Sequence, residues 1–277
     1  MPDIPDSEQL LRQATREIER RDAEILLAAA WRLTRAQLLS RAGEPVPAEV
    51  AERFAASWPR RASGTPVAYL LGQREFWSMS FEVSPAVLVP RPETELLVER
   101  ILHLLRAPSA EVADMGTGSG AIAIAIAHER PGWRVIGSDV SPDALAIARR
   151  NGERLVAGRV EWRCGDWYAP LAGRRFDALV SNPPYIAAQD PALLEDGVRC
   201  EPRLALTPGG DGLGALHTLI NGAPDHLKPA GWLALEHGAM QGAPVRAALV
   251  ARGFAHVTSH RDLAGHERVT EAQWPTP

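Results

Sequence analysis

The feature that most constrains the fold of this chain is a regular alternation of short apolar strands and helices that begins near Ala110. We expect strands at 112–115, 134–138, 160–163, 176–180, 232–236, 257–260 and 268–272, and helices at 121–127, from Ser141, and at about 241–252. Alternation of this kind is typical of a mostly parallel sheet with helices on both faces. The pattern therefore predicts an α/β fold with a doubly wound sheet.

The first 72 residues have a different pattern, that of short helices punctuated by prolines. Ser7 and Asp22 are suitable N-cap residues for the first two of these helices. Residues 1–70 carry ten acidic and ten basic side chains, so the segment is neutral. A neutral surface suits a protein partner better than a phosphate backbone. We therefore expect a small helical bundle at 1–72 that docks a protein.

Residues 73–90 have the pattern of a hairpin that links this bundle to the alternating region. Two phenylalanines flank a polar turn, as in a pair of antiparallel strands. Pro90-Arg91-Pro92 then breaks the chain, and Glu93 and Glu95 open a helix, where acidic side chains suit the helix dipole. The α/β domain is therefore expected at 91–277.

Composition argues against several kinds of site and partner. The formal net charge of −4 is unlike that of a chain held to nucleic acid by its whole surface. The two cysteines, Cys164 and Cys200, belong to no CxxC or Cys/His cluster, so we expect no metal site. The N-terminus lacks the features of a signal peptide, and the uncharged run Met115–Ala127 is too short to span a bilayer. We expect a cytoplasmic protein with no stable nucleic-acid partner and no membrane partner.

A glycine-rich loop, Gly116-Thr117-Gly118-Ser119-Gly120, lies between the first strand of the alternating region and its helix. Glycines let the backbone turn sharply and let a ligand approach closely, while N–H groups of the helix N-terminus face that ligand. Asp139 ends the next strand, where a carboxylate can accept both hydroxyls of a ribose. The loop and Asp139 predict a nucleoside cofactor, and NAD is compatible with them because the glycine spacing also matches the dinucleotide fingerprint.

Two further features favour S-adenosylmethionine over NAD. Asp114, just ahead of the glycines, is placed to meet the ammonium group of the methionine part, a group that NAD lacks. Asp166 and Trp167 follow the third strand, where the carboxylate can bind the adenine amine and the indole can cover the ring. Trp167 is equally compatible with a packing role. We therefore expect S-adenosylmethionine, with Trp167 as a candidate contact.

The tetrapeptide Asn182-Pro183-Pro184-Tyr185 follows the fourth strand, at the carboxyl edge where open α/β sheets bind ligands. From composition alone it should arise with a probability on the order of 2 in 10,000. A planar NH2 group has a weakly nucleophilic lone pair, and its two hydrogens can be held by the Asn182 side-chain oxygen and a Pro183 carbonyl. These acceptors stabilise the charge that develops as the nitrogen attacks a methyl group. Tyr185 can stack on the planar substrate.

This chemistry needs no general base before the attack, because the proton can leave after methyl transfer. Catalysis is then mainly positioning. The motif predicts methylation of an amide-type nitrogen, with Asn182, Pro183 and Tyr185 as catalytic residues. A purely structural turn is the alternative, but a turn does not require Asn and Tyr on either side of two prolines.

Further stretches extend the pattern along nearly the whole chain. They are Pro66-Val67-Ala68-Tyr69-Leu70-Leu71-Gly72, Arg74-Glu75-Phe76, Val89-Pro90-Arg91-Pro92-Glu93-Thr94-Glu95, Asp114 to Gly120, Ser181 to Ile186, Leu235-Glu236-His237-Gly238 and Glu267-Arg268-Val269. With these stretches the chain resembles the PrmC/HemK family, the N5-glutamine methyltransferases of peptide chain release factors. The resemblance implies a Rossmann-like class I methyltransferase domain at 91–277 with a small N-terminal helical bundle.

The resemblance also implies an activity and a site. The chain would be an S-adenosylmethionine-dependent protein-(glutamine-N5) methyltransferase acting on the Gly-Gly-Gln loop of class I peptide chain release factors. The cofactor would be bound by Gly116, Thr117, Gly118, Ser119, Gly120, Asp139, Trp167 and Asn182. The glutamine pocket would be formed by Asn182, Pro183, Pro184 and Tyr185.

Other classes are compatible with parts of the pattern. An adenine or cytosine amino-methyltransferase acting on nucleic acid could hold a flipped base with the same motif. This chain differs from such an enzyme in its acidity, its neutral helical N-terminus and its lack of a long basic insert. A binding protein or an NAD-linked enzyme could use the same fold. Glu236 and His237 end the fifth strand, and we expect structural roles for both, not an acid–base pair.

Overall fold

The computed structural model describes residues 5–276, which divide into two compact units. One unit comprises the chain up to Gly72 together with Leu194–Cys200, and the other comprises Gln73–Leu193 and the chain from Glu201 onward. The segment Leu194–Cys200 belongs by sequence position to the domain expected at 91–277, yet it is hydrogen-bonded to Ser63 and Gly64. Residues 1–4, on which the expectation about a signal peptide rests in part, lie outside the described residues.

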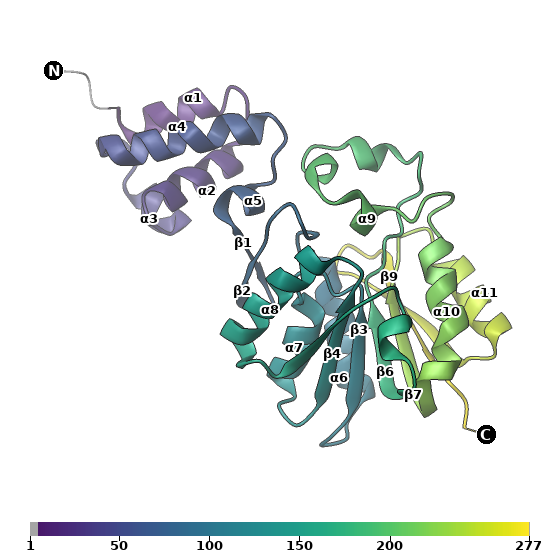
Figure 1. Ribbon diagram of the computed structural model, residues 1–277. Coiled ribbons are helices and arrows are strands. Elements are labelled where there is room, and N and C mark those ends of the chain that lie inside the picture. The colour runs from purple at the N-terminus through teal and green to yellow at the C-terminus, as the bar shows by residue number, and fades with distance from the viewer. Residues whose placement is uncertain (1–4, 277) are drawn as a thin grey trace. The chain divides into compact units, whose positions relative to one another are not determined.

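The first unit is helical (Figure 1). Its helices are α1 (Ser7–Ala14), α2 (Arg20–Ala30), α3 (Arg35–Ser40), α4 (Ala48–Ala62) and α5 (Val67–Leu71), with a 3-10 turn at Val198–Cys200. Leu10, Leu27 and Phe54 are among the buried side chains that form its core. Each helix supplies one apolar face to this core, as expected of a small bundle.

The N-caps of the first two helices differ from those expected. Asp6, not Ser7, caps α1, and its side chain accepts from the Gln9 N–H at 2.7 Å. Ser7 is buried and donates its hydroxyl to a backbone carbonyl elsewhere in the unit. Asp22 lies inside the first turn of α2 and pairs with Arg61. Both cap predictions were wrong because long-range partners, which local sequence does not reveal, engage the two side chains.

A hairpin opens the second unit where one was expected. Its strands are β1 (Gln73–Phe76) and β2 (Met79–Glu82), which pair antiparallel. Trp77 and Ser78 between them have φ values of 52° and 55°, and two such residues suit the twist of a tight hairpin. Oε1 of Glu95 accepts from the Trp77 N–H at 2.7 Å. Glu95 therefore holds the hairpin in addition to standing at a helix N-terminus.

The described residues of the second unit form a seven-stranded sheet in the order β5-β4-β3-β6-β7-β9-β8 (Figure 1). The strands are β3 (Glu111–Met115), β4 (Arg134–Asp139), β5 (Val160–Cys164), β6 (Phe176–Ser181), β7 (Leu227–Glu236), β8 (Ala255–Arg261) and β9 (Glu267–Gln273). The pairs from β5 to β7 are parallel, whereas β9 is antiparallel to both β7 and β8. This order confirms the predicted doubly wound α/β fold.

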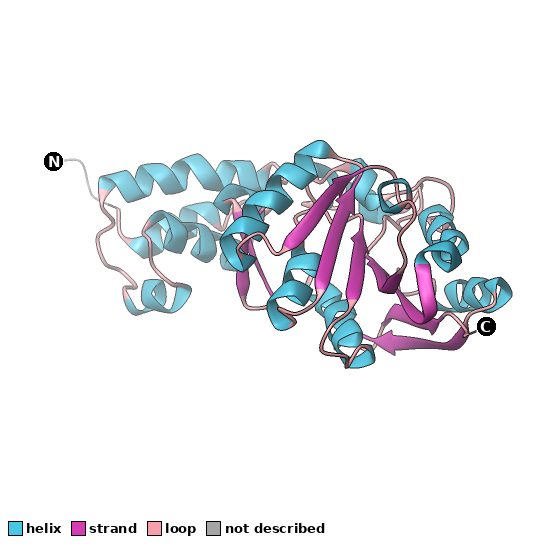
Figure 2. Cartoon of the chain, turned by 60° about the horizontal axis from the view of Figure 1, so that its bottom comes forward, coloured by secondary structure: helices cyan, strands magenta, loops and turns pink. Residues whose placement is uncertain are grey.

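Helices cover both faces of the sheet (Figure 2). One face packs on α6 (Glu95–Leu104), α7 (Ala121–Glu129) and α8 (Pro142–Val156), and the other on α10 (Gly214–His226) and α11 (Gly242–Arg252). Shorter helical turns are Pro92–Thr94, Ala169–Leu171, Pro191–Leu194 and α9 (Arg203–Leu206). Along β3, Val112 faces the first layer and Ala113 the second, as strand alternation requires. Within residues 5–276, no helix has the length and apolar character needed to cross a membrane.

Candidate active site

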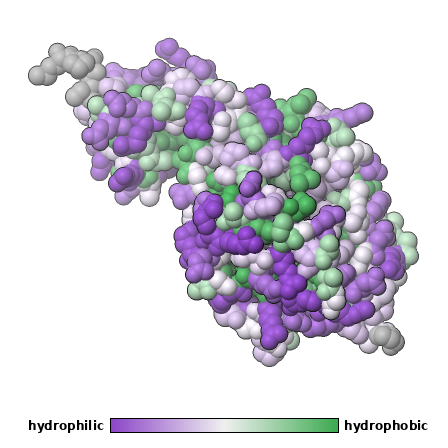
Figure 3. Space-filling view, in the orientation of Figure 1, coloured by the Kyte–Doolittle hydropathy of each residue, from purple (hydrophilic) through white to green (hydrophobic). Residues whose placement is uncertain are grey.

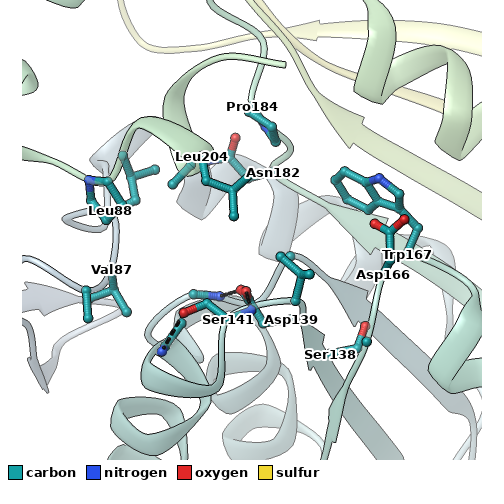
Figure 4. Close-up of a pocket in the computed structure, with 18 residues that line it drawn as sticks. Val87, Leu88, Ser138, Asp139, Ser141, Asp166, Trp167, Asn182, Pro184 and Leu204 are labelled. Atoms are coloured by element: carbon teal, nitrogen blue, oxygen red, sulfur yellow. Dashed lines mark hydrogen bonds between the residues drawn. The ribbon is translucent and has the colours of Figure 1, made fainter. Parts of the chain in front are cut away.

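A cavity of about 210 Å³ lies at the carboxyl ends of β3, β4, β5 and β6. Residues that follow these strands form much of its wall, namely Gly116, Gly118, Asp139, Trp167, Asn182 and Pro184. Figure 4 shows Val87 and Leu88 across the cavity from Trp167, with Asn182 and Asp139 between them. The parallel strands thus bring predicted residues from four loops to one edge of the sheet.

The glycine-rich loop turns the chain from β3 into α7. Gly116, Gly118 and Gly120 have φ values of 72°, 55° and 84°, which favour glycine. A Cβ at Gly118 would meet no described atom within 4 Å, so the backbone there is open to an approaching ligand. A Cβ at Gly120 would lie 2.8 Å from the ring of Trp162. Gly116 and Gly118 therefore face the cavity, whereas Gly120 allows close packing.

Asp114 lies fully buried behind this loop. Its Oδ2 accepts from Thr117 Oγ1 at 2.5 Å and from the Ala123 N–H at 3.2 Å. Its Oδ1 has no hydrogen-bond partner among residues 5–276. Burial raises the pKa of Asp114 to about 7, against the opposing effect of the two hydrogen bonds. Asp114 braces the loop, in which Thr117 and Ser119 are also buried. It does not line the cavity, and its contact with the methionine ammonium stays a prediction.

Asp139, at the end of β4, faces the cavity with both oxygens held by backbone N–H groups. Oδ2 accepts from Gly118 and Oδ1 from Ser141, each at 2.9 Å. Burial raises the pKa of Asp139, and these hydrogen bonds oppose the rise. Each oxygen keeps a second lone pair, so the carboxylate can accept two ligand hydroxyls in a fixed orientation.

Trp167 lies on the opposite wall from Val87 (Figure 4). Its φ of 39° is rare for a bulky side chain. The indole packs against the core layer beneath α10, and its Cζ3 would lie 3.7 Å from a Cβ at Gly116. Trp167 therefore packs on the core and also lines the cavity beside Asp166, and its contact with the cofactor stays a prediction.

Asn182 follows β6 and is held from behind by Thr94, a residue that no sequence pattern indicated. Its Nδ2 donates to Oγ1 of Thr94 at 3.1 Å, and Thr94 is buried. Pro184 lines the cavity with Asn182, whereas Pro183 is buried. The hydroxyl of Tyr185 donates to Glu236 Oε1 at 3.2 Å. The four motif residues thus differ in placement, and two buried side chains, Thr94 and Glu236, support them.

Glu236 ends β7 and is buried next to Tyr185. Burial raises its pKa to about 7, and the nearby hydroxyls of Thr94 and Tyr185, together with the charge of Arg268, oppose the rise. Glu93 adds a smaller upward effect. His237 is turned away from this group, since its ring nitrogens lie 2.9 Å from Gly238 O and 2.8 Å from Thr270 Oγ1. Glu236 and His237 do not form an acid–base pair.

The outer wall of the cavity was also missed from sequence. Pro202, Leu204 and Ala205 line it from the segment that contains α9. This segment is anchored by Glu201, whose two oxygens accept from Nη2 of Arg91 at 2.9 Å. Arg91 and Glu201 each lie next to proline, but they are 110 residues apart in the sequence, so no local pattern indicates their contact.

The cavity fits S-adenosylmethionine. Gly118 leaves the backbone open, Asp139 offers two oriented acceptors, and Trp167 offers an aromatic face. Among the described residues, no group of three or more His, Cys, Asp or Glu side chains could hold a metal ion. A parallel sheet with β9 inserted antiparallel between β7 and β8, and this site at its carboxyl edge, define a class I methyltransferase.

Comparison with known proteins identifies the family. A family model described as PrmC N-terminal domain matches residues 6–72, and one described as methyltransferase small domain matches residues 92–213. A release factor glutamine methyltransferase of Xylella fastidiosa (strain Temecula1) is 50% identical over 98% of this chain and 99% of that protein. One of Pseudomonas aeruginosa is 51% identical over 92% of each. A methyltransferase structure from Pyrococcus furiosus has a TM-score of 0.54 at 19% identity, covering 80% of this chain and 100% of that one, which supports the fold.

The chain belongs to the release factor glutamine methyltransferase family. It is an enzyme whose cofactor is S-adenosylmethionine, and the NAD alternative is excluded.

Proposed function

We propose that this chain transfers the methyl group of S-adenosylmethionine to the side-chain nitrogen, N5, of the glutamine in the Gly-Gly-Gln loop of class I peptide chain release factors. Relatives about half identical to it are named release factor glutamine methyltransferases. The observation that carries the proposal is the orientation of Asn182. Because Nδ2 is engaged by Thr94, the side-chain oxygen Oδ1 is left to accept from a planar NH2 group.

S-adenosylmethionine supplies an electrophilic methyl group on a sulfonium sulfur. We assign its ribose to Asp139, its adenine to the side of Trp167, and its close approach to the backbone at Gly116 and Gly118. Thr117, Ser119 and Gly120 then act indirectly, by giving the loop its shape. Asn182 lies between the part of the cavity that we assign to the cofactor and the part that we assign to the substrate glutamine.

In the substrate half, Asn182 Oδ1 and the Pro183 carbonyl accept the two hydrogens of the glutamine NH2. Charge develops on the nitrogen as it is methylated, so these hydrogen bonds strengthen in the transition state. Pro184 stiffens the loop, and Tyr185 is held by Glu236 so that its ring can stack on the amide. The proton leaves after methyl transfer.

The cavity rim suits an exposed loop with small residues beside the glutamine. Val140 and Leu204 line the cavity and remain 47% and 63% exposed, so apolar contact is available at its mouth. Figure 3 shows apolar side chains gathered within an otherwise largely hydrophilic face. A Gly-Gly-Gln loop can enter because its glycines add no side chains. The neutral N-terminal unit would supply a second contact with the release factor. The proposal places the enzyme in the cytoplasm, without stable binding to nucleic acid or to a membrane.

The test offers purified release factor and DNA side by side to the full chain with labelled S-adenosylmethionine. We expect label on the glutamine of the Gly-Gly-Gln loop, mapped by mass spectrometry, and none on a release factor whose loop glutamine is replaced by alanine. Label on DNA adenine or cytosine, with none on the release factor, would instead establish the nucleic-acid alternative. Removing residues 1–72 should lower methylation of intact release factor far more than cofactor affinity, because a second contact raises the effective concentration of the loop.

A further inference from the structure

The backbone at the end of the Asn182-Pro183-Pro184-Tyr185 motif is held by residues far away in the sequence. The N–H of the next residue, Ile186, donates to the carbonyl of Leu206 at 2.9 Å. The carbonyl of Tyr185 itself accepts from a side chain, since Nε2 of Gln241 donates to it at 3.0 Å. Gln241 lies immediately before α11, 56 residues further along the chain. A side chain from a distant element therefore fixes the main chain at Tyr185.

Both hydrogen bonds of the Gln241 amide have a direction that its backbone partners determine. Oε1 accepts from the N–H of Gly238 at 2.9 Å, and a backbone N–H can only donate. Nε2 donates to the carbonyl of Tyr185, which can only accept. A reversed amide would place donor against donor and acceptor against acceptor. Gln241 therefore joins Gly238 to Tyr185 in one orientation.

Gly238 is itself anchored to the sheet. Its carbonyl accepts from the Gln241 N–H at 2.8 Å and lies 2.9 Å from Nδ1 of His237. Because a carbonyl only accepts, Nδ1 carries the ring proton, and burial lowers the pKa of His237 so that the ring is neutral. Nε2 then accepts from the hydroxyl of Thr270, a buried residue of β9, at 2.8 Å. The peptide that holds Gln241 is thus fixed to β9 and to the end of β7.

Gly212 leaves the space in which the bond between Gln241 and Tyr185 forms. Gly212 is buried and has a φ of 84°. A Cβ at this position would collide with the Tyr185 carbonyl oxygen and would lie 3.0 Å from Nε2 of Gln241. Gly209, in the same segment, has a φ of 85°, but a Cβ there would meet no described atom within 4 Å. The backbone favours glycine at both positions, whereas the contact with Tyr185 requires it only at Gly212.

We propose that Gln241 and Gly212 are positioning residues that fix the main chain at Tyr185 for methyl transfer. The proposal rests on the function proposed above, in which the Pro183 carbonyl and the Tyr185 ring receive the glutamine amide. Neither positioning residue lines the cavity. Without the bond from Gln241 the motif can shift, and its acceptor and its ring are then less well placed when the nitrogen is methylated. The loss should appear in kcat and not in cofactor affinity, because other loops hold the cofactor.

Gln241→Glu separates the two bonds of the side chain. At pH 8 the new carboxylate is ionised, so it still accepts from Gly238 but places an oxygen without a hydrogen against the Tyr185 carbonyl. Gln273→Glu is the matched control, since Nε2 of Gln273 also donates to a backbone carbonyl, that of Ala230, at 2.9 Å. That bond lies at the end of β9, away from the cavity.

Gly212→Ala disturbs the same contact without any change to Gln241. Gly209→Ala is its control, because the two glycines have nearly equal φ values and an alanine at either position has similar backbone strain. Only the alanine at position 212 would displace the Tyr185 carbonyl. Gln241→Glu and Gly212→Ala are the two test variants, and Gln273→Glu and Gly209→Ala are the two control variants.

The Tyr185 carbonyl can be observed directly, because Tyr185-Ile186 is the only Tyr-Ile pair in the sequence. In protein labelled with ¹³C-carbonyl tyrosine and ¹⁵N-isoleucine, this peptide bond alone joins the two labels and gives a coupled signal. The carbonyl chemical shift reports the hydrogen bond from Gln241. We expect it to move in both test variants and to stay at the wild-type value in both control variants.

Steady-state kinetics on release factor at pH 8 give the second readout. The loss of one oriented hydrogen bond should lower kcat by about threefold to tenfold in the two test variants. S-adenosylmethionine affinity, measured by calorimetry, should not change. Both control variants should keep the wild-type kcat.

The outcomes separate this proposal from the proposed function. An unchanged Tyr185 carbonyl signal in Gln241→Glu overturns the proposed contact, and a shifted signal with the wild-type kcat overturns the positioning role. An equal loss of kcat in Gln273→Glu also overturns it. If Gln241→Glu does not fold, the contrast between Gly212→Ala and Gly209→Ala decides. A wild-type chain that leaves release factor unmethylated refutes the proposed function, while the carbonyl signal still reports the contact with Gln241.

Discussion

Asp114 should make the stability of this protein fall as pH rises. Burial raises its folded pKa to about 7, whereas its ordinary value is 3.8. Between pH 5 and pH 7 the unfolded carboxyl is ionised, whereas the folded one is protonated at pH 5 and still half-protonated at pH 7, so the folded state binds more protons. The stabilisation is complete below the unfolded pKa and is lost as pH rises through the folded one. At about 1.4 kcal/mol per pKa unit, and with the folded group half-ionised at pH 7, Asp114 should remove about 2 kcal/mol between pH 5 and pH 7.

Asp114→Asn tests this magnitude, because an asparagine carbonyl can still accept from Thr117 and Ala123 but does not titrate. Urea unfolding of the cofactor-free protein at pH 5, 6, 7 and 8 gives the free energy of unfolding of both proteins. The variant should gain about 2 kcal/mol relative to wild type between pH 5 and pH 7. Ile136→Val, a buried change on β4, should instead cost about 0.5–1.5 kcal/mol at every pH. Parallel stability curves for Asp114→Asn and wild type would refute the reasoning.

Three further changes probe the site. Asp139→Ala should weaken S-adenosylmethionine binding by about 1.5–3 kcal/mol, measured by calorimetry, and unchanged affinity would remove it from the ribose role. Asn182→Ala should lower turnover by roughly a hundredfold or more while much of the cofactor affinity remains, and near-normal turnover would contradict the amine-holding mechanism. Gly120→Ala should cost about 1–3 kcal/mol of folding stability through its positive φ and the contact with Trp162, and an equal melting temperature would count against that packing.

The central strands β3, β4 and β6 could be predicted because each contains a short apolar run with turn residues after it. The helix α10 could not, since Gly214, Gly222 and Pro224 give its sequence a weak intrinsic preference for helix. Tertiary packing decides instead. Leu216 and Leu219 are fully buried against the sheet, and a Cβ at Gly222 would collide with the ring of Tyr168. The loss of intrinsic preference is offset by burial, which local sequence does not show.

The candidate site was predictable where one loop supplies a complete local motif. The glycine loop and Asn182 to Tyr185 are such motifs, and their roles remain predictions. Thr94 was missed because its contact with Asn182 spans 88 residues of sequence. Glu236 was expected to have a structural role, but its partner Tyr185 is 51 residues away and could not be named. Thr94 could have been selected from its stretch of resemblance, but nothing local indicates that its hydroxyl reaches Asn182.

Both halves of the site are braced by a buried carboxyl with a pKa of about 7, Asp114 behind the glycine loop and Glu236 behind Tyr185. Ionising either group in a desolvated position destabilises the fold. Glu236 also accepts from the hydroxyl of Tyr185, whose ring we propose to stack on the substrate amide. Glu236→Gln should therefore raise the free energy of unfolding at pH 8 while it lowers kcat. If Glu236 acted on stability alone, Glu236→Gln would change the free energy of unfolding and leave kcat as in the wild type.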